Sequence, residues 1–346
     1  MVASEQKVMR VGVVGAGRIG VVHITNMLST RFVEVTAVCT VVAHEQKWVR
    51  ETVPGATVYS DFDSFIKDSS IDVVWICSPT QFHQEHVTKA LEAGKHAFTE
   101  KPLSGDEKTA WDMYHLSLKY PHLKVACGFV RRFANVYIEA RKAIASGAIG
   151  DVIAVRASTA DCFIPPTEQF LNYIKHSGGI FVDCNIHDID LSLFLIGEDK
   201  TAQTAYATGT SLVYPKFAEW GDGDNVHGIV KFKEDLVFNI YGTRDNLHGH
   251  HTYTEIIGTK GRIMVNGEPR GLNVDISTDN GTKMVPTQDH QTMFADAFKT
   301  EVEHFRDWVL FDRQDHGFNL KDAAKAVSIG VALQNSFRSG DVEHIQ

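Results

Sequence analysis

The stretch VGVVGAGRIG at residues 11–20 decides the fold of this chain. Its first half is an apolar run typical of a buried strand, and its glycines form the pattern G-x-G-x-x-G before a helical segment. Glycines allow a tight turn and a close backbone approach, while the first helical turn offers unpaired N–H groups to a pyrophosphate. The stretch therefore predicts a dinucleotide-binding domain. The predicted phosphate contacts are Gly15, Gly17, Arg18, Ile19 and Gly20.

The succession of predicted strands and helices changes along the chain and indicates two domains. Through residue 130, short β-rich runs alternate with helical patterns, which predicts an open, mostly parallel sheet of the doubly wound Rossmann type. Residues 131–346 read differently: successive strands with turn residues at close spacing suggest an antiparallel meander over 202–275. A helix is expected from about residue 184 to 195, and two more close the chain at 291–310 and 321–337. The predicted boundaries are 1–130 for the dinucleotide-binding domain and 131–346 for the second α/β domain.

Composition excludes several classes of protein. The 346 residues suit two domains, and a net charge of −9 argues against a nucleic-acid partner. The sequence contains no run of about 18 apolar residues, so it predicts no membrane span. The five cysteines form no C-x-x-C pair, which is typical of buried thiols in a reducing compartment. Because the first residues also lack the apolar region of a secretory signal, we expect a cytoplasmic protein.

The end of the second strand bears on the choice of cofactor. An Asp or Glu at this place normally bonds the adenosine ribose of NAD, yet residues 37–42 read AVCTVV and contain no acid. Thr40 could donate to a 2′-phosphate, with His44 and Lys47 as the nearest cations, which favours NADP weakly. Alternatively, Thr40 bonds the 2′-hydroxyl of NAD, so the sequence predicts an NAD(P) cofactor with a weak preference for NADP.

Two turns after later strands carry polar residues toward the same cofactor. Ser78-Pro79 follows the buried strand at residues 72–77, and Glu100-Lys101-Pro102 follows the strand one βα unit further on. The carboxyl ends of parallel strands share one edge of a sheet, so Lys101 places a cation where the reacting end of a dinucleotide would lie. The alternative is a solvated surface lysine, the commonest state of that residue type.

A second set of candidate catalytic residues lies in the helix predicted from residue 184. Asp183 and His187 are four residues apart and would share a helix face with Asp190. A carboxylate beside an imidazole orients it and makes it a better general base for an alcohol. The alternatives are a capping Asp with a structural histidine, and a metal site in which these residues join His248, His250 and His251.

Together these motifs resemble the glucose–fructose oxidoreductase, inositol dehydrogenase and rhizopine-catabolism (Gfo/Idh/MocA) family, most of all its inositol 2-dehydrogenases. The resemblance rests on GAGRIG, Glu100-Lys101-Pro102, GFVRRF at residues 128–133 and the segment from Asp183 to Asp190, and it covers nearly the whole chain. It implies a Rossmann domain followed by an α/β domain with a large open, mostly antiparallel sheet that serves oligomerisation. It also implies that the Lys101–Pro102 peptide is cis.

The resemblance carries roles over to matching positions. Lys101, Asp183 and His187 are the expected catalytic residues, with His187 as proton acceptor. Thr40 departs from the acid of NAD-dependent members, and residues 161–176 match no family motif, so the substrate stays open. Besides the five phosphate contacts, the expected cofactor-binding residues are Thr40, Ser78, Pro79, His83, Glu100 and Lys101. The candidate substrate contacts are Arg131, Asp161, His176, Tyr241 and Asn246.

The expected activity is hydride transfer between a nicotinamide cofactor and a secondary alcohol of a polyol or sugar. The alternatives are an NADPH-dependent reductase of a keto-sugar, aldose or imine, a non-catalytic dinucleotide sensor, and a redox-neutral glycosidase. The presence of all three expected catalytic residues speaks against a sensor. We expect a small-molecule substrate, no metal, no nucleic acid, no membrane, and a homodimer or homotetramer.

Overall fold

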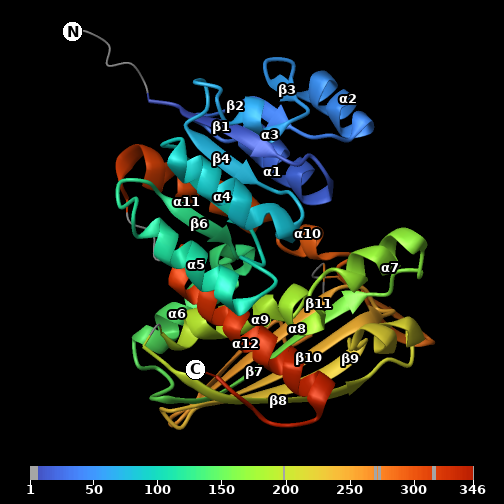
Figure 1. Cartoon of the computed structure of the whole chain (residues 1–346). Helices are drawn as coiled ribbons and strands as arrows, with labels where there is room; N and C mark the ends of the chain where they lie inside the picture. The colour runs from blue at the N-terminus through green and yellow to red at the C-terminus, as the bar shows by residue number, and fades with distance from the viewer. Residues whose placement is uncertain (1–6, 198, 269–270, 272–273, 314–316, 346) are drawn as a thin grey trace. The chain divides into compact units, whose positions relative to one another are not determined.

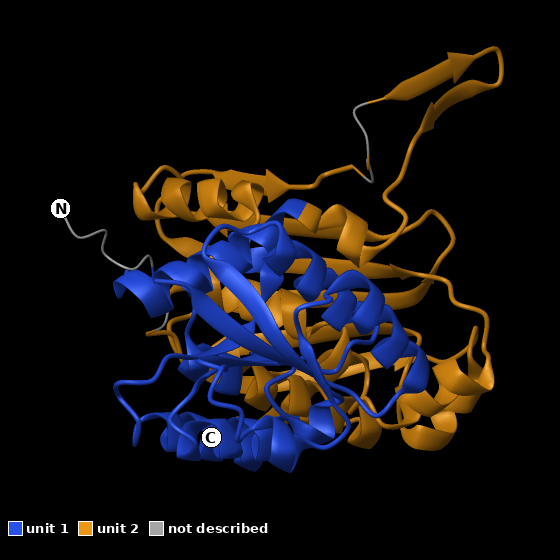
Figure 2. Cartoon of the chain, turned by 90° about the horizontal axis from the view of Figure 1, so that it is seen from above, with its two compact units in different colours: residues 1–104, 108–133, 296–324 blue, residues 105–107, 134–295, 325–346 orange. Residues whose placement is uncertain are grey.

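The computed structural model describes residues 7–345 except 198, 269–270, 272–273 and 314–316. The chain forms two compact units (Figure 2). Unit 1 comprises residues 1–104, 108–133 and 296–324, and unit 2 comprises 105–107, 134–295 and 325–346. The sequence placed everything after residue 130 in a second domain, whereas the structure returns residues 296–324 to unit 1.

Unit 1 is built on the predicted parallel sheet (Figure 1). Its six strands lie in the order β3-β2-β1-β4-β5-β6, and every pairing is parallel. This is the strand order of the dinucleotide-binding fold: β2 and β3 are added on one side of β1, and β4 to β6 are added on the other side. Strands such as VVWI at residues 73–76 are buried on both faces, as parallel strands covered by helices must be. The strands are β1 Met9–Val14, β2 Val33–Cys39, β3 Thr57–Tyr59, β4 Val73–Ile76, β5 His96–Glu100 and β6 Val125–Gly128.

Helices connect these strands and close the aromatic core of unit 1. Trp75 and Phe98 stack in this core with ring centroids 3.6 Å apart. Phe305, which comes from α11, meets both rings edge-on, so a segment from late in the chain completes the core. The helices are α1 Arg18–Leu28, α2 Ala43–Thr52, α3 Phe62–Phe65, η1 Thr80–Phe82, α4 His83–Glu92, α5 Glu107–Ser117, η2 Val130–Phe133 and α11 Ala295–Phe311.

Unit 2 contains a seven-stranded sheet in the order β12-β11-β7-β10-β9-β8-β15. The sheet is largely antiparallel, as expected, but β7 and β10 pair in parallel at its centre. The predicted simple meander is therefore wrong at this pair, because β7 enters the sheet between β10 and β11. The strands are β7 Val152–Cys162, β8 Ala202–Thr210, β9 Asn225–Phe232, β10 Val237–Asn246, β11 His251–Gly258, β12 Arg262–Val265 and β15 Glu343–His344; β13 Asp275–Thr278 and β14 Gly281–Met284 form a separate hairpin.

One face of this sheet is covered by helices (Figure 1). The close packing needs a glycine at position 228, where an added Cβ would lie 2.9 Å from Leu333 of α12 and 3.1 Å from Phe181 of α8. Helix α9 is buried almost all round and packs on β7 and β10. The elements of this layer and its connections are α6 Asn135–Ala145, α7 Glu168–Lys175, α8 Ile180–Asp183, α9 Ile186–Ile196, η3 Pro215–Trp220, α10 His290–Met293 and α12 Leu320–Ser339.

The other face of the sheet carries a row of side chains that begins and ends with exposed apolar residues. Strand residues alternate between faces, so paired residues across neighbouring strands share one face. Tyr206, Ile229 and Met264 on this face are 41%, 48% and 53% exposed. We call this face the outer face. The row across it reads Tyr206, Ile229, Asn239, Arg156, Glu255 and Met264.

One predicted helix starts two residues later in the structure, and another is interrupted. The helix expected over residues 184–195 is α9, and it follows the short α8 after a break at Cys184 and Asn185. The helix expected over 291–310 is split into α10 and α11 at Phe294. Among the described residues, no helix is both long and apolar enough to cross a membrane.

Candidate active site

The phosphate loop of unit 1 has the close backbone packing that its glycines predict. Gly15 adopts φ +88°, and an added Cβ there would lie 2.8 Å from the carbonyl oxygen of Cys77. A Cβ on Gly20 would lie 2.1 Å from the carbonyl oxygen of Gly15. No larger residue fits either position without displacing backbone, so the turn that opens α1 has the shape of a dinucleotide cradle.

The turns after β4 and β5 are tied together by a buried histidine. His83 places Nδ1 2.9 Å from the carbonyl oxygen of Pro102 and Nε2 3.0 Å from that of Ser78. Burial lowers the pKa of His83, and these two carbonyl oxygens oppose the effect. The Ser78 hydroxyl lies 3.0 Å from Nδ1 of His86. The sheet order puts both turns beside the phosphate loop at one carboxyl edge.

Lys101 follows directly on β5, at this same edge. Its backbone N–H donates to Oε2 of Glu100 over 3.1 Å, and its side chain is partly buried. The Lys101–Pro102 peptide is cis, as the sequence resemblance implied. Arg131, a predicted substrate contact, lies in η2 after β6 and is 1% exposed. Unit 1 thus supplies a phosphate cradle after β1, a lysine after β5 and an arginine after β6, all strands of one parallel sheet.

The acid that the sequence lacked at the end of β2 is supplied from α2. Oε2 of Glu45 accepts from the Thr40 hydroxyl over 2.5 Å and from the Ala16 N–H over 3.2 Å. Its Oε1 lies 3.4 Å from where a Cβ on Gly17 would stand. A carboxylate therefore sits at the phosphate loop beside Thr40, although it comes five residues later than the usual position.

Unit 2 holds Asp183 between two donors. The Tyr173 hydroxyl donates to Oδ1 of Asp183 over 2.6 Å, and the Arg244 guanidinium donates to Oδ2 over 2.9 Å. Arg244 is 6% exposed; burial would lower its pKa, but the negative charge of Asp183 dominates and the pKa is raised. Asp183 is accordingly a fixed carboxylate, held at the end of α8 by groups from α7 and β10.

His187 lies in the first turn of α9, four residues after Asp183. Its ring stacks on His290 with centroids 4.8 Å apart, and His290 meets His250 edge-on at 5.2 Å. His250 bonds Oδ1 of Asp161 through Nδ1 over 2.9 Å. The structure therefore gathers three histidines with Asp161 at one end of the helix-covered face of unit 2.

Asp161 is the one predicted substrate contact of unit 2 that joins this group. Its Oδ2 also accepts from the Cys184 thiol over 3.2 Å. Burial would raise the pKa of Asp161, but the hydrogen bond to His250 and the charges of His250 and Arg244 lower it. Asp161 is thus an ionised group, held at the end of β7.

The other three predicted contacts of unit 2 make their hydrogen bonds with other residues. Tyr241 precedes Gly242, where an added Cβ would meet Asn185 at 2.1 Å on the helix-covered side, so the Tyr241 side chain points to the outer face. There its hydroxyl donates to Asn225 over 3.0 Å. His176 is exposed at the end of α7, and Asn246 ends β10 with its amide donating to the carbonyl oxygen of Gly249 over 2.7 Å.

The histidines considered for a metal site are separated. His250 faces Asp161, whereas His251 bonds the carbonyl oxygen of Asn266 over 2.8 Å and His248 is exposed. Within the described part of the chain, one group of three side chains has its ligating atoms within 4.8 Å of one another: His23, Glu100 and Glu301.

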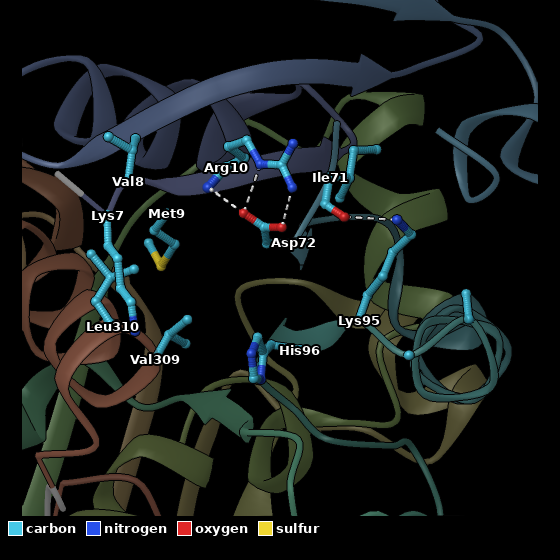
Figure 3. Close-up of a pocket in the computed structure, with 12 residues that line it drawn as sticks. Lys7, Val8, Met9, Arg10, Ile71, Asp72, Lys95, His96, Val309 and Leu310 are labelled. Carbon is cyan, nitrogen blue, oxygen red and sulfur yellow. Dashed lines mark hydrogen bonds and ion pairs between the residues drawn. The ribbon is translucent and has the colours of Figure 1, made fainter. Parts of the chain in front are cut away.

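A pocket of about 560 Å³ lies at the opposite edge of the parallel sheet (Figure 3). Its lining comes from the amino ends of β1, β4 and β5 and from the end of α11. The Arg10 guanidinium is bound to Asp72, with Nε 2.9 Å from Oδ2, and Lys95 donates to the carbonyl oxygen of Ile71 over 2.7 Å. Ligands of open α/β sheets bind at the carboxyl edge, so this pocket is separate from the candidate site.

A nucleotide cradle at the carboxyl edge of a parallel sheet, followed by a lysine, defines a dinucleotide-dependent oxidoreductase. The sequence comparisons give the same class. Residues 9–125 match the description "Oxidoreductase family, NAD-binding Rossmann fold", and residues 141–344 match "Oxidoreductase family, C-terminal alpha/beta domain". The chain belongs to the Gfo/Idh/MocA family, as its motifs predicted.

Several similar proteins are inositol dehydrogenases. The chain is 34% identical to scyllo-inositol 2-dehydrogenase (NAD(+)) of Bacillus subtilis over 340 residues, which cover 96% of this chain and 95% of that one. It is 31% identical to myo-inositol 2-dehydrogenase of Thermotoga maritima, covering 95% and 96%. A crystal structure of scyllo-inositol dehydrogenase from Lactobacillus casei, with NAD(H) and scyllo-inositol bound, matches with a TM-score of 0.92 at 30% identity and covers 98% and 99%.

Proposed function

We propose that this protein is an NAD-dependent dehydrogenase that oxidises a ring hydroxyl of an inositol. The observation that carries the proposal is the match, over 98% of the chain, to a dehydrogenase solved with NAD(H) and scyllo-inositol. The phosphate cradle, Lys101, Asp183 and His187 support it, because they are the kinds of groups that an alcohol dehydrogenase needs: a dinucleotide site, a cation, and a carboxylate with an imidazole.

The catalytic roles follow from the chemistry of the side chains. When bound, the nicotinamide supplies the acceptor for the hydride that leaves the carbinol carbon. His187 removes the hydroxyl proton as general base, and the Lys101 ammonium stabilises the alkoxide that develops. Asp183, fixed by Tyr173 and Arg244, provides the negative charge that favours the imidazolium form of His187.

The cofactor we propose is NAD, against the weak sequence-based preference for NADP. The Glu45 carboxylate occupies the place beside Thr40 and the phosphate loop. A ribose 2′-hydroxyl can donate to such a carboxylate, whereas a 2′-phosphate would be repelled by it. The five-residue shift from the usual position explains why the strand end alone suggested otherwise.

We also propose that the protein is a homodimer or homotetramer whose copies meet through the outer face. On this face the exposed apolar residues Tyr206, Ile229 and Met264 lie at the two ends of a row whose middle is polar. Oligomers of this kind usually form two-fold interfaces, in which one patch pairs with its own copy. Light scattering coupled to gel filtration measures the assembly, and Ile229→Asp is expected to shift it toward the monomer.

The function is tested by a screen of inositols, other polyols and aldoses with NAD or NADP, followed through the absorbance of reduced nicotinamide. We expect turnover with scyllo- or myo-inositol and NAD, and at least tenfold lower kcat/KM with NADP. Turnover restricted to keto-sugars or aldoses with NADPH would replace this proposal with the reductase. Dinucleotide binding without turnover of any substrate in either direction would replace it with the sensor.

A further inference from the structure

Three ionisable side chains meet in the interior of unit 1. His23 of α1, Glu100 at the end of β5 and Glu301 of α11 each place a ligating atom within 4.8 Å of the other two. His23 and Glu301 are fully buried, and Glu100 is 8% exposed. We call these residues the buried triad. It joins the helix of the phosphate loop, the strand before Lys101 and a helix from late in the chain.

Glu100 uses its two carboxyl oxygens for two different partners. Oε1 lies 2.6 Å from Nε2 of His23, and Oε2 accepts the backbone N–H of Lys101 over 3.1 Å. The His23 ring is enclosed by Trp75, Phe98 and Phe298, and its Nδ1 has no hydrogen-bond partner among the described residues. A proton on Nδ1 would be buried without an acceptor, so the tautomer that fits is neutral, with Nε2–H donating to Glu100.

Glu301 differs from Glu100 in having neither oxygen hydrogen-bonded within the described structure. A buried, unpaired carboxylate beside a second carboxylate is costly, because the interior neither solvates nor screens the two charges. Burial, and then the negative charge of Glu100, raise the pKa of Glu301 well above its ordinary value. A neutral acid at Glu301 resolves the conflict and leaves one negative charge in the triad, on Glu100.

The distances favour a proton over a metal ion. Two ligands of one tetrahedral zinc ion, each about 2.0–2.1 Å from the metal, lie about 3.3 Å apart. The 2.6 Å between His23 and Glu100 is shorter than this and is a hydrogen-bond distance. The pair is therefore joined directly by a hydrogen bond.

We propose that the buried triad is the positioning element of Lys101, with Glu301 as a neutral acid facing an ionised Glu100. Glu100 holds the backbone N–H of Lys101, and His23 connects that carboxylate to the helix that starts at the phosphate loop. Ionisation of Glu301 would put a second negative charge against Glu100 and disturb the turn. The inference rests on the proposed role of Lys101 and names three residues that act through it.

Only a few other titratable groups among the described residues face Glu301 and could also make kcat depend on pH. They are His23 from α1, Glu100 from β5 and Cys77, which follows β4. The Cys77 thiol is itself kept neutral, because burial and then the charges of Glu100 and Glu301 raise its pKa. A fall of kcat at alkaline pH can therefore be assigned to Glu301 if substituting that residue alone moves it.

The test compares four variants of the full-length protein with NAD and the polyol that gives turnover. Glu100→Gln removes the charge and keeps the shape; we expect kcat to fall at least tenfold while the Kd for NAD changes less than threefold. Glu301→Leu removes the acid and fills its space with an apolar side chain, and we expect its kcat to fall to a similar degree. Glu301→Gln keeps a neutral polar group, so it should recover most of that loss and move the alkaline fall of kcat to higher pH. The matched control is the exposed Glu92→Gln, which should follow the wild type.

The outcomes separate this inference from the proposed function. If Lys101→Met loses turnover but Glu100→Gln keeps kcat within twofold, the triad does not position Lys101 and the inference fails alone. If Lys101→Met keeps its turnover, the proposed function fails first. Superimposable pH profiles of wild type and Glu301→Gln would also overturn the inference, as would one equivalent of metal in the purified protein that Glu301→Gln lacks. Should Glu301→Leu not fold, Glu100→Gln and the two pH profiles decide.

Discussion

Arg244 donates to Asp183 across 2.9 Å, and both side chains of this pair are buried. The pair joins β10 to the end of α8, four residues before His187. Since the Tyr173 hydroxyl takes the other oxygen, the carboxylate is fixed from two sides. Arg244 is therefore as much a part of the candidate site as the residues that the sequence motif contains.

Loss of Arg244 should affect both stability and turnover. Arg244→Met leaves the Asp183 carboxylate buried without its cation, and breaking such a pair costs about 3–5 kcal/mol. We expect the free energy of unfolding in urea to fall by that order and kcat to fall at least tenfold. The control is Lys142→Met, whose ion pair with Glu139 is exposed on both sides and whose loss should cost about 0–1 kcal/mol. Equal, small losses in the two variants would contradict this reading.

Lys101→Met should reduce turnover and spare cofactor binding. An ammonium that stabilises a developing alkoxide contributes to the transition state rather than to the dinucleotide complex. Removing a group of this kind lowers kcat by roughly 10²–10³-fold. Stopped-flow turnover and fluorescence titration with NADH measure the two quantities, and the exposed Lys108→Met serves as control. A parallel loss of NADH affinity would assign Lys101 to binding instead.

Glu45→Gln should relax the preference for NAD. The carboxylate bound to Thr40 would repel a 2′-phosphate, and its removal eliminates that repulsion while keeping a hydrogen-bonding side chain. We expect the ratio of kcat/KM for NADP over NAD to rise at least fivefold. Glu51→Gln, a change of an exposed glutamate on the same helix, is the matched control. An unchanged ratio would show that another group sets cofactor choice.

Gly20→Ala should weaken dinucleotide binding. The added Cβ would stand 2.1 Å from the carbonyl oxygen of Gly15, so the loop must open. We expect the Kd for NADH to rise at least tenfold, as measured by fluorescence titration. Gly55→Ala is a suitable control, because a Cβ there meets nothing within 4 Å. Comparable affinities for the two variants would contradict the shape assigned to the cradle.

The free energy of unfolding should depend on pH through Glu301. Its pKa is raised in the folded protein, so between pH about 4.5 and that raised value the folded state binds more protons than the unfolded state. Stability is therefore greatest at the acidic end of this window and falls as pH rises, by up to about 1.4 kcal/mol per pH unit from this group. Urea unfolding at pH 5 to 8 should give a smaller fall for Glu301→Gln than for the wild type. Parallel curves would mean that Glu301 is ionised in both states.

The sequence predicted the elements whose signal is local. The parallel sheet followed from uninterrupted apolar runs such as VVWI, and the cradle followed from glycines in a strand–turn–helix context. The spacing of Asp183 and His187 singled them out as a catalytic pair, which stays a prediction; the expected shared helix is interrupted at Cys184 and Asn185 between them. The cis Lys101–Pro102 peptide was implied by family resemblance and not by any local rule.

What the sequence missed depends on long-range pairing. Arg244 reaches Asp183 from 61 residues away, and no spacing rule connects them. Tyr241 was named as a substrate contact for its polarity, but the register of β10 turns it to the outer face. Glu45 lay outside the window usually inspected for the cofactor acid. His290 was also missed. The capping residue Asp289 before it signals the start of a helix, but the stacking of His290 on His187 follows only from the fold.

The return of residues 296–324 to unit 1 makes that unit discontinuous in the chain. A fragment ending near residue 130 would lack Phe305 and leave Trp75 and Phe98 facing water. On the ribosome, the nucleotide-binding half cannot complete its interior until most of the polypeptide has been synthesised, so the half that starts first is among the last to finish. Expression of the isolated half is accordingly expected to yield aggregated material, and a soluble version requires grafting the late helix back onto its end.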